Sequence, residues 1–205
     1  DYPMSSSDLR KFMACPHKWR YGEQDDEGTD ATKWGTLIDA MLLRPLGQEM
    51  PDDIVVCPDT YTDSKTGDEK PWNWNSNTAK AWKAKNEGKT IFKSDTIAEA
   101  QKAVRTLMAN DVVRSVIQAS TFQVMLTAEY KDADTGIIVP VCGLLDIVPT
   151  PESKHGKMLC DLKTTNDASK FGWTRGLHSR GYMTQAALYL DLWNAATGEK
   201  RSQWF

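Results

Sequence analysis

The sequence predicts an α+β fold, with a small central mixed sheet flanked by helices and a helical N-terminal portion. Three observations predict it. Capped segments with apolar residues at helical spacing fill the first half of the chain. Apolar residues then alternate with a period of two between residues 122 and 148, and helical spacing returns after residue 169. With 205 residues, of which 40% are hydrophobic, the chain is long enough to bury a core.

Capping residues and helix breakers predict the helices of the first half. The run from Ser5 to Asp8 caps a helix that we expect to continue to about Tyr21. Prolines, a glycine and many polar residues predict an irregular segment over 47–75. The other helices expected before the sheet cover about 32–43, ending near Pro45, then 77–85, 95–108 (capped by Ser94) and 111–118.

The alternating segments predict the sheet. Residues 122–131 and 137–148 are expected to form two antiparallel strands, joined by the turn at 132–136. Residues 157–163 are expected to form a third strand. Helices are expected over about 169–177 and 182–196, and residues 202–205 resemble the beginning of a further strand.

These elements predict one domain over residues 1–205. Residues 47–118 would be an irregular and helical insertion, and residues 119–205 would be the core of the domain. We find no apolar stretch of membrane-spanning length, no signal peptide at the N-terminus and no CxxC pair among the four cysteines. A reduced, cytoplasmic protein without a membrane partner is therefore expected.

The charge is unevenly distributed along the chain. The formal net charge of −3 argues against a protein that coats nucleic acid nonspecifically. Residues 65–114, however, carry ten bases against six acids, a local net charge of +4. An enzyme with a local basic groove remains compatible with this composition.

Two acids in apolar runs are the main candidates for chemistry. Asp146 follows Gly143-Leu-Leu, and Asp161 begins the sequence Asp-Leu-Lys about fifteen residues later. Alternation along an extended chain places Asp161 and Lys163 on the same face. Two carboxylates on adjacent strands can hold a divalent cation, and a lysine beside them can orient or deprotonate a water molecule. This is the local chemistry needed to cleave a phosphodiester.

Several motifs, in this order and spacing, resemble the PD-(D/E)xK nuclease superfamily, specifically its RecB-like branch and the RecE-type (exodeoxyribonuclease VIII-like) exonucleases. Residues 5–19 resemble the opening helix of that branch, S-x-S-x-L-x-x-F-x-x-C-P followed by an aromatic residue. The other segments that carry the resemblance are 34–43 (G-T-x-x-H-x-x-L), 77–90, the catalytic motifs at 143–146 and 161–163, and the Q-x-x-x-Y helix at 185–189. The resemblance implies a restriction-endonuclease-like fold.

The resemblance also implies roles for these residues. Asp146 and Asp161 would hold Mg²⁺ (Mn²⁺ is an alternative), helped by the backbone carbonyl of Leu162. Lys163 would lie near the attacking water and stabilise the developing negative charge. Gln185 and Tyr189 lie four residues apart on one helical face, from which they could contact the phosphate or the lysine.

Asp39 is the main departure from the family pattern. It stands where these nucleases usually have a metal-binding histidine. A carboxylate can also bind Mg²⁺, so a working variant with Asp39 as a third metal ligand is the favoured interpretation. The alternative is a weakened site.

Other candidates are less specific. Glu129 could add a water-mediated metal contact or form a surface salt bridge. Lys80 and Trp82 belong to a run rich in lysine and tryptophan, which could bind DNA or pin a long segment onto the domain. Three residues at the end of the helix expected over 169–177, or just after it, could contact phosphate: Arg175, His178 and Arg180.

The predicted function is that of a Mg²⁺-dependent exonuclease acting on the ends of linear double-stranded DNA. Polarity from 5′ to 3′, a ring-shaped homo-oligomer, a phage or prophage origin, a role in recombination or repair and a single-strand annealing recombinase as partner are implied by resemblance alone. No cysteine follows Cys160, so an iron–sulfur cluster is not expected. The alternatives are an endonuclease or single-strand nuclease on the same fold, and a catalytically weakened DNA-binding module.

Overall fold

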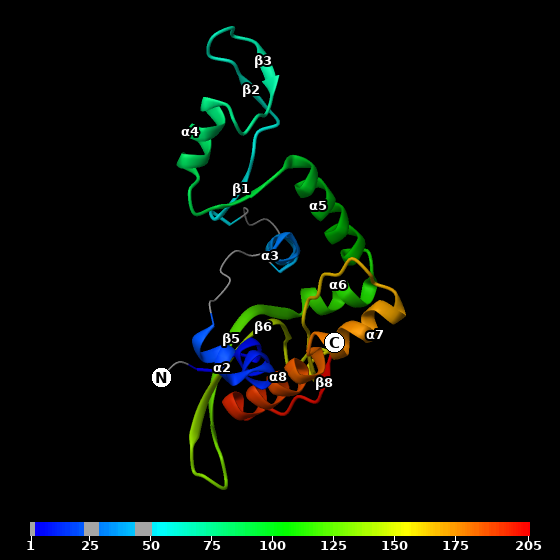
Figure 1. The fold of residues 1–205 in the computed structure, drawn as a ribbon. Coiled ribbons are helices and arrows are strands. Elements are labelled where there is room, and N and C mark those ends of the chain that lie inside the picture. The colour runs from blue at the N-terminus through cyan, green and yellow to red at the C-terminus, as the bar shows by residue number, and fades with distance from the viewer. Residues whose placement is uncertain (1–2, 23–28, 44–50) are drawn as a thin grey trace. The chain divides into compact units, whose positions relative to one another are not determined.

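The computed structural model describes residues 3–22, 29–43 and 51–205. It divides the chain into two compact units, which are described separately (Figure 1). The first unit comprises Asp1–Gly28 and Asp111–Phe205, and the second comprises Thr29–Asn110. Helices and small sheets occur together within the described residues, which confirms the α+β class. None of the described helices is long and apolar enough to cross a membrane.

The first unit contains the central hairpin and the helices that pack around it. Its helices are α1 (Ser6–Ala14), α2 (Pro16–Tyr21), α6 (Asp111–Gln118), α7 (Lys170–Ser179) and α8 (Tyr182–Thr197). Its strands are β5 (Ser120–Lys131), β6 (Ile138–Pro149), β7 (Met158–Leu159) and β8 (Gln203–Trp204).

The predicted N-terminal helix is two helices. Ser5 caps α1 as expected, because its side chain accepts from the Asp8 N–H and the Asp8 carboxylate accepts from the Ser5 N–H. The prediction of one helix to Tyr21 is wrong, since the chain becomes extended at Cys15, where φ is −163° and ψ is 103°. Pro16 explains the break: it disfavours helical geometry at the residue before it and is well tolerated in the first turn of a new helix.

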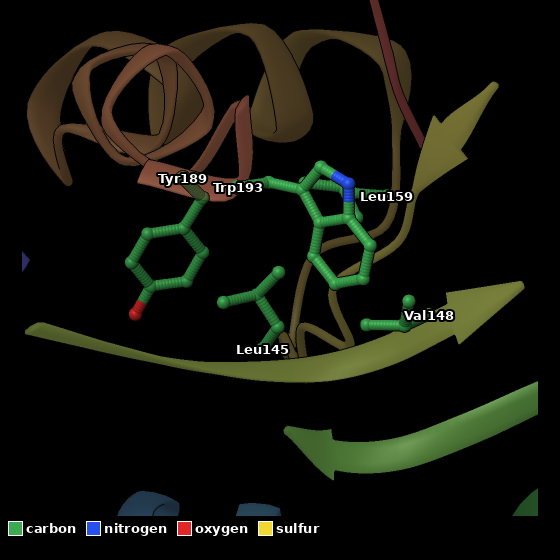
Figure 2. Packing of buried hydrophobic residues seen from close by; sticks show 5 residues of the cluster. All are labelled: Leu145, Val148, Leu159, Tyr189 and Trp193. Atoms are coloured by element: carbon green, nitrogen blue, oxygen red, sulfur yellow. The ribbon is translucent and has the colours of Figure 1, made fainter. Parts of the chain in front are cut away.

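The β5–β6 hairpin is the scaffold of the first unit, and its prediction is confirmed. The two strands are antiparallel, with Ser120 opposite Pro149 and Lys131 opposite Ile138. One face of the hairpin packs against α8 and forms a hydrophobic core (Figure 2). The buried members of this core cluster are Leu145, Val148, Leu159, Tyr189 and Trp193.

The predicted third strand is much shorter than expected. Regular pairing covers only Met158–Leu159, which runs parallel to β8. Cys160 then forms an isolated antiparallel bridge with Ile147 of β6, and beyond it the chain leaves regular strand geometry. The Asp161 N–H still donates 3.1 Å to the Phe205 carbonyl. The strand expected at the end of the chain is present as β8.

Arg201 anchors the segment before β8 to the sheet. It is 2% exposed, and its Nη1 donates to the carbonyls of Pro149 (2.8 Å) and Met158 (2.9 Å). Its guanidinium also lies 4.5 Å from the ring centroid of Trp193 and forms an ion pair with Glu199. A buried charge with these partners holds the ends of β6, β7 and β8 together.

In its described residues, the second unit contains three helices and two small sheets. Its elements are α3 (Asp30–Leu42), β1 (Ile54–Val56), β2 (Thr60–Thr62), β3 (Glu69–Pro71), α4 (Asn77–Lys85), β4 (Thr90–Phe92) and α5 (Ser94–Met108). The irregular segment predicted over 47–75 therefore contains strands, and residues 47–50 of it and Pro45 lie outside the described residues. β1 pairs in parallel with β4, and β2 pairs with β3 in a hairpin.

Two helices of the second unit begin close to the predicted positions. α4 starts at Asn77 as expected, and the Ser76 hydroxyl caps it by accepting from the Ala79 N–H. The cap predicted at Ser94 is wrong by one residue: Ser94 is the first residue of α5, and Lys93 is the N-cap. The Ser94 hydroxyl is instead hydrogen-bonded to Asp59.

Candidate active site

Asp146 lies near the end of β6 and is held by the chain segment that follows β7. The Leu162 N–H donates 3.0 Å to its Oδ2. The bridge between Ile147 and Cys160 brings the two segments into register at this point. Two runs that are separated in the sequence therefore deliver Asp146 and Asp161 to the same place.

Asp161 is buried, and both of its carboxylate oxygens have partners. Only 5% of its side chain is exposed. Gln185, from α8, donates 3.0 Å from Nε2 to Oδ1, and the Lys163 ammonium forms an ion pair with Oδ2. The structure thus brings together Asp146, Asp161, Lys163 and Gln185.

Burial raises the pKa of Asp161 from 3.8 to about 6. The charge of Lys163 and its contact with the carboxylate lower this pKa, while the neighbouring Asp146 carboxylate raises it. Two carboxylates that repel each other in a desolvated place favour either a proton or a bound cation. A cation at this point would remove the repulsion.

The chemistry of these donors fits Mg²⁺. Mg²⁺ prefers oxygen ligands and is commonly held by one or two carboxylates, with water and substrate oxygens completing its shell. In the part of the chain that the structure describes, no three His, Cys, Asp or Glu side chains gather at a place that could hold a metal. Asp146 and Asp161 would therefore supply two carboxylate ligands, and the carbonyl of Leu162 remains a predicted ligand.

Gln123 marks strain in the backbone beside Asp146. In the register set by Phe122 with Ile147 and Val124 with Leu145, Gln123 stands opposite Asp146. Its φ is 52°, and it is the one non-glycine residue with positive φ among those described. Such outliers persist where surrounding structure holds them and often lie at functional sites.

A pocket of about 170 Å³ opens beside Lys163. Arg175 and Arg180, two of the predicted phosphate contacts, line it, whereas His178 is an exposed residue of α7 and is not among the lining residues. Trp173 and Tyr182 also line the pocket and were not identified from the sequence. Their position in the sequence, on either side of the two arginines, could have identified them.

Tyr189 lies in the core, although it follows Gln185 by one helical turn. It is 6% exposed and belongs to the core cluster (Figure 2). An added Cβ at Gly143 would lie 2.9 Å from Tyr189 Cε1, so Gly143 allows the ring to pack directly on β6. The ring of Tyr189 therefore supports the hairpin from which Asp146 projects.

Four other candidates lie on other elements. Glu129 is exposed opposite Pro140, six positions along β5 from Gln123, or roughly 20 Å at the rise of a strand. Asp39 is a half-buried residue of α3 in the second unit. Lys80 and Trp82 are on α4, where Trp82 packs edge-on against Trp72 and Lys80 is exposed.

An acidic pair beside a lysine, carried by a strand hairpin and the next extended segment, defines a PD-(D/E)xK-type site. The family comparison agrees. Residues 5–205 match the family described as a PDDEXK-like domain of unknown function (DUF3799), and the chain belongs to this family. The predicted superfamily and its nuclease-type fold are thereby confirmed. No curated protein matches the sequence.

Proposed function

We propose that this protein is a Mg²⁺-dependent deoxyribonuclease of the RecE type that degrades linear double-stranded DNA from its ends. One observation carries the proposal: Asp146, Asp161, Lys163 and Gln185 meet at one place in the first unit. Membership of a PDDEXK-like family supports a nuclease, and the pairing of acids with a lysine supports phosphodiester hydrolysis.

Each residue has a distinct task in this proposal. Asp146 and Asp161 would hold Mg²⁺, which when bound would polarise the phosphate and lower the pKa of a coordinated water. Lys163 forms an ion pair with Asp161 and would stabilise negative charge that develops on the phosphate oxygens. Gln185 fixes the orientation of the Asp161 carboxylate through its hydrogen bond.

Cations beside the acids would position the DNA strand. Arg175 and Arg180 line the pocket that Lys163 also lines. Arginine side chains bind phosphate through charge-assisted hydrogen bonds, so the pocket would draw the DNA backbone toward the acidic pair. In the second unit, Asp39 remains a proposed metal ligand, and Lys80 and Trp82 remain proposed DNA contacts.

The finer assignment rests on the resemblance of the sequence motifs. Attack on DNA ends, 5′-to-3′ polarity, a ring-shaped homo-oligomer and an annealing partner belong to the RecE-type proposal. A weakened DNA-binding module is the second candidate, and the observation that favours it is Asp39 in place of the usual histidine.

Digestion of labelled DNA tests the proposal. Linear and closed circular duplexes, labelled within the strand, would be incubated with the protein in Mg²⁺ or in EDTA. We expect loss of the linear substrate alone, abolished by EDTA and by Lys163→Ala. Lys154→Ala is the matched control, because Lys154 is an exposed lysine in the turn before β7.

Three other outcomes separate the alternatives. Cleavage of the closed circle would identify an endonuclease. Intact DNA in every lane, with binding retained in a gel shift, would favour the weakened module. Activity that survives Lys163→Ala would contradict the role assigned to this lysine.

A further inference from the structure

The pocket beside Lys163 has aromatic walls as well as cationic ones. Trp173 of α7 and Tyr182 of α8 face each other with ring centroids 6.0 Å apart and planes inclined by 36°. Trp173 lines the pocket and is 43% exposed. A half-exposed indole offers a flat surface on which another ring can stack.

These aromatic walls are continuous with the candidate active site. The Lys163 ammonium lies 5.3 Å from the ring centroid of Tyr182 while it pairs with Asp161. Tyr182 in turn faces Trp173. Successive contacts through Tyr182 and Lys163 therefore connect Trp173 to Asp161.

The charge of the pocket favours an anion. Lys163, Arg175 and Arg180 line it together with one acid, Asp167. The Asp167 carboxylate is already engaged, because its Oδ1 accepts from the Ser169 N–H at 3.0 Å. It also packs against Gly172 so closely that an added Cβ there would lie 2.3 Å from Asp167 Oδ2.

The pocket has room for a group much larger than one water molecule. At about 170 Å³ it is several times the roughly 30 Å³ that one water molecule occupies in the liquid. Aromatic walls next to guanidinium groups match the two parts of a nucleotide, since a base stacks on aromatic rings and its phosphate pairs with arginine.

We infer that this pocket takes one unpaired nucleotide of the strand being cut, with its base against Trp173 and its phosphate toward Arg175 and Arg180. A base reaches such a side wall only after it leaves the duplex stack. The site therefore acts on a nucleotide already separated from its complement. This inference rests on the proposed function and adds a preference for unpaired DNA next to the cut.

Binding of single-stranded DNA in EDTA tests the inference without cleavage. A short fluorescent oligothymidylate and an abasic strand of the same length carry the same phosphates, so their difference in affinity measures base contacts. We expect Trp173→Ala to bind oligothymidylate more weakly than the wild type by roughly five- to 150-fold, the range expected from losing one base stack. The abasic strand should bind the wild type weakly and lose nothing further in the variant.

Two variants control the experiment. Tyr21→Ala removes an aromatic side chain that is 74% exposed on α2 and is not among the residues that line the pocket, and it should bind as the wild type does. Trp173→Phe keeps a ring and should restore most of the affinity. It also remains informative if Trp173→Ala folds poorly.

Several results would overturn the inference. They are equal affinity of Trp173→Ala and wild type, an equal loss for the abasic strand, or no single-strand binding at all. Duplex cleavage in Mg²⁺ is scored separately. Cleavage with binding that does not depend on Trp173 would overturn only this inference, whereas Trp173-dependent binding without cleavage would overturn only the proposed nuclease activity.

Discussion

The side-chain amide of Gln185 donates a hydrogen bond of 3.0 Å to Asp161 Oδ1, across 24 residues of sequence. The Lys163 ammonium forms an ion pair with the other oxygen of the same carboxylate. The carboxylate of Asp161 is thus fixed at one oxygen by a group from α8 and at the other by a group from its own segment after β7. Its orientation is set before any substrate or ion arrives.

Gln185→Ala should reduce DNA cleavage by about ten- to hundredfold, because a hydrogen bond to a charged group contributes about 1.5–3 kcal/mol. The loss should appear in kcat, since the amide orients Asp161 and does not bind the DNA in this proposal. Gln101→Ala on α5 is the control, as Gln101 is an exposed glutamine on a helix of the second unit. Unchanged cleavage by Gln185→Ala would remove Gln185 from the site.

The raised pKa of Asp161, about 6, predicts how the stability of the metal-free protein depends on pH. Between about pH 3.8 and 6 the folded protein holds a proton that the unfolded chain has released. The stabilisation that this proton provides is full below pH 3.8 and is lost as the pH rises through 6.

Urea unfolding in EDTA at pH 5 and at pH 7.5 measures this effect. We expect the wild type to lose more free energy of unfolding between these pH values than Asp161→Asn, whose side chain does not titrate. Equal losses in the two proteins would show that the carboxyl pKa is not raised.

Gly143→Ala should destabilise the first unit by about 1–3 kcal/mol, the usual cost of overpacking a core. The added Cβ would lie 2.9 Å from both Leu192 Cδ2 and Tyr189 Cε1. Thr127→Ala, at an exposed position of β5, is the control for a substitution on the same hairpin. Chemical denaturation measures both, and a stability of Gly143→Ala equal to that of Thr127→Ala would contradict the packing of Tyr189 on β6.

Arg201→Met should cost about 3 kcal/mol of unfolding free energy, because it leaves the buried carbonyl of Pro149 and the partly buried carbonyl of Met158 without their donor. Methionine keeps much of the volume, so the loss measures the polar contacts more than a cavity. Lys200→Met changes the adjacent exposed residue and should be nearly neutral. A thermal midpoint of Arg201→Met equal to that of the wild type would refute the anchoring role.

The elements that were predicted well have strong local signals. α6 begins and ends where expected, at Asp111 and Gln118, and the β5–β6 hairpin agrees to within two residues. Capping residues and period-two alternation are properties of a short stretch of chain, so they can be recognised without knowledge of the rest.

The strands that were missed or misjudged depend on distant partners. β1 and β4 are three residues each and pair in parallel, with Ile54 opposite Thr90. The strand expected over 157–163 is limited to Met158–Leu159, because only these two residues pair regularly with β8. Such short segments carry too little periodicity to be identified alone.

The sequence by itself determined the class of this protein and the acidic pair, since the order and spacing of Asp146, Asp161, Lys163 and Gln185 are properties of the chain. Tertiary structure decided what the side chains around these residues contact. It placed the Tyr189 ring on Gly143 in the core, and it brought Trp173 and Tyr182 to the pocket beside Lys163. Spacing along one helix fixes which residues share a face, but the packing of that helix against other elements decides what the face meets.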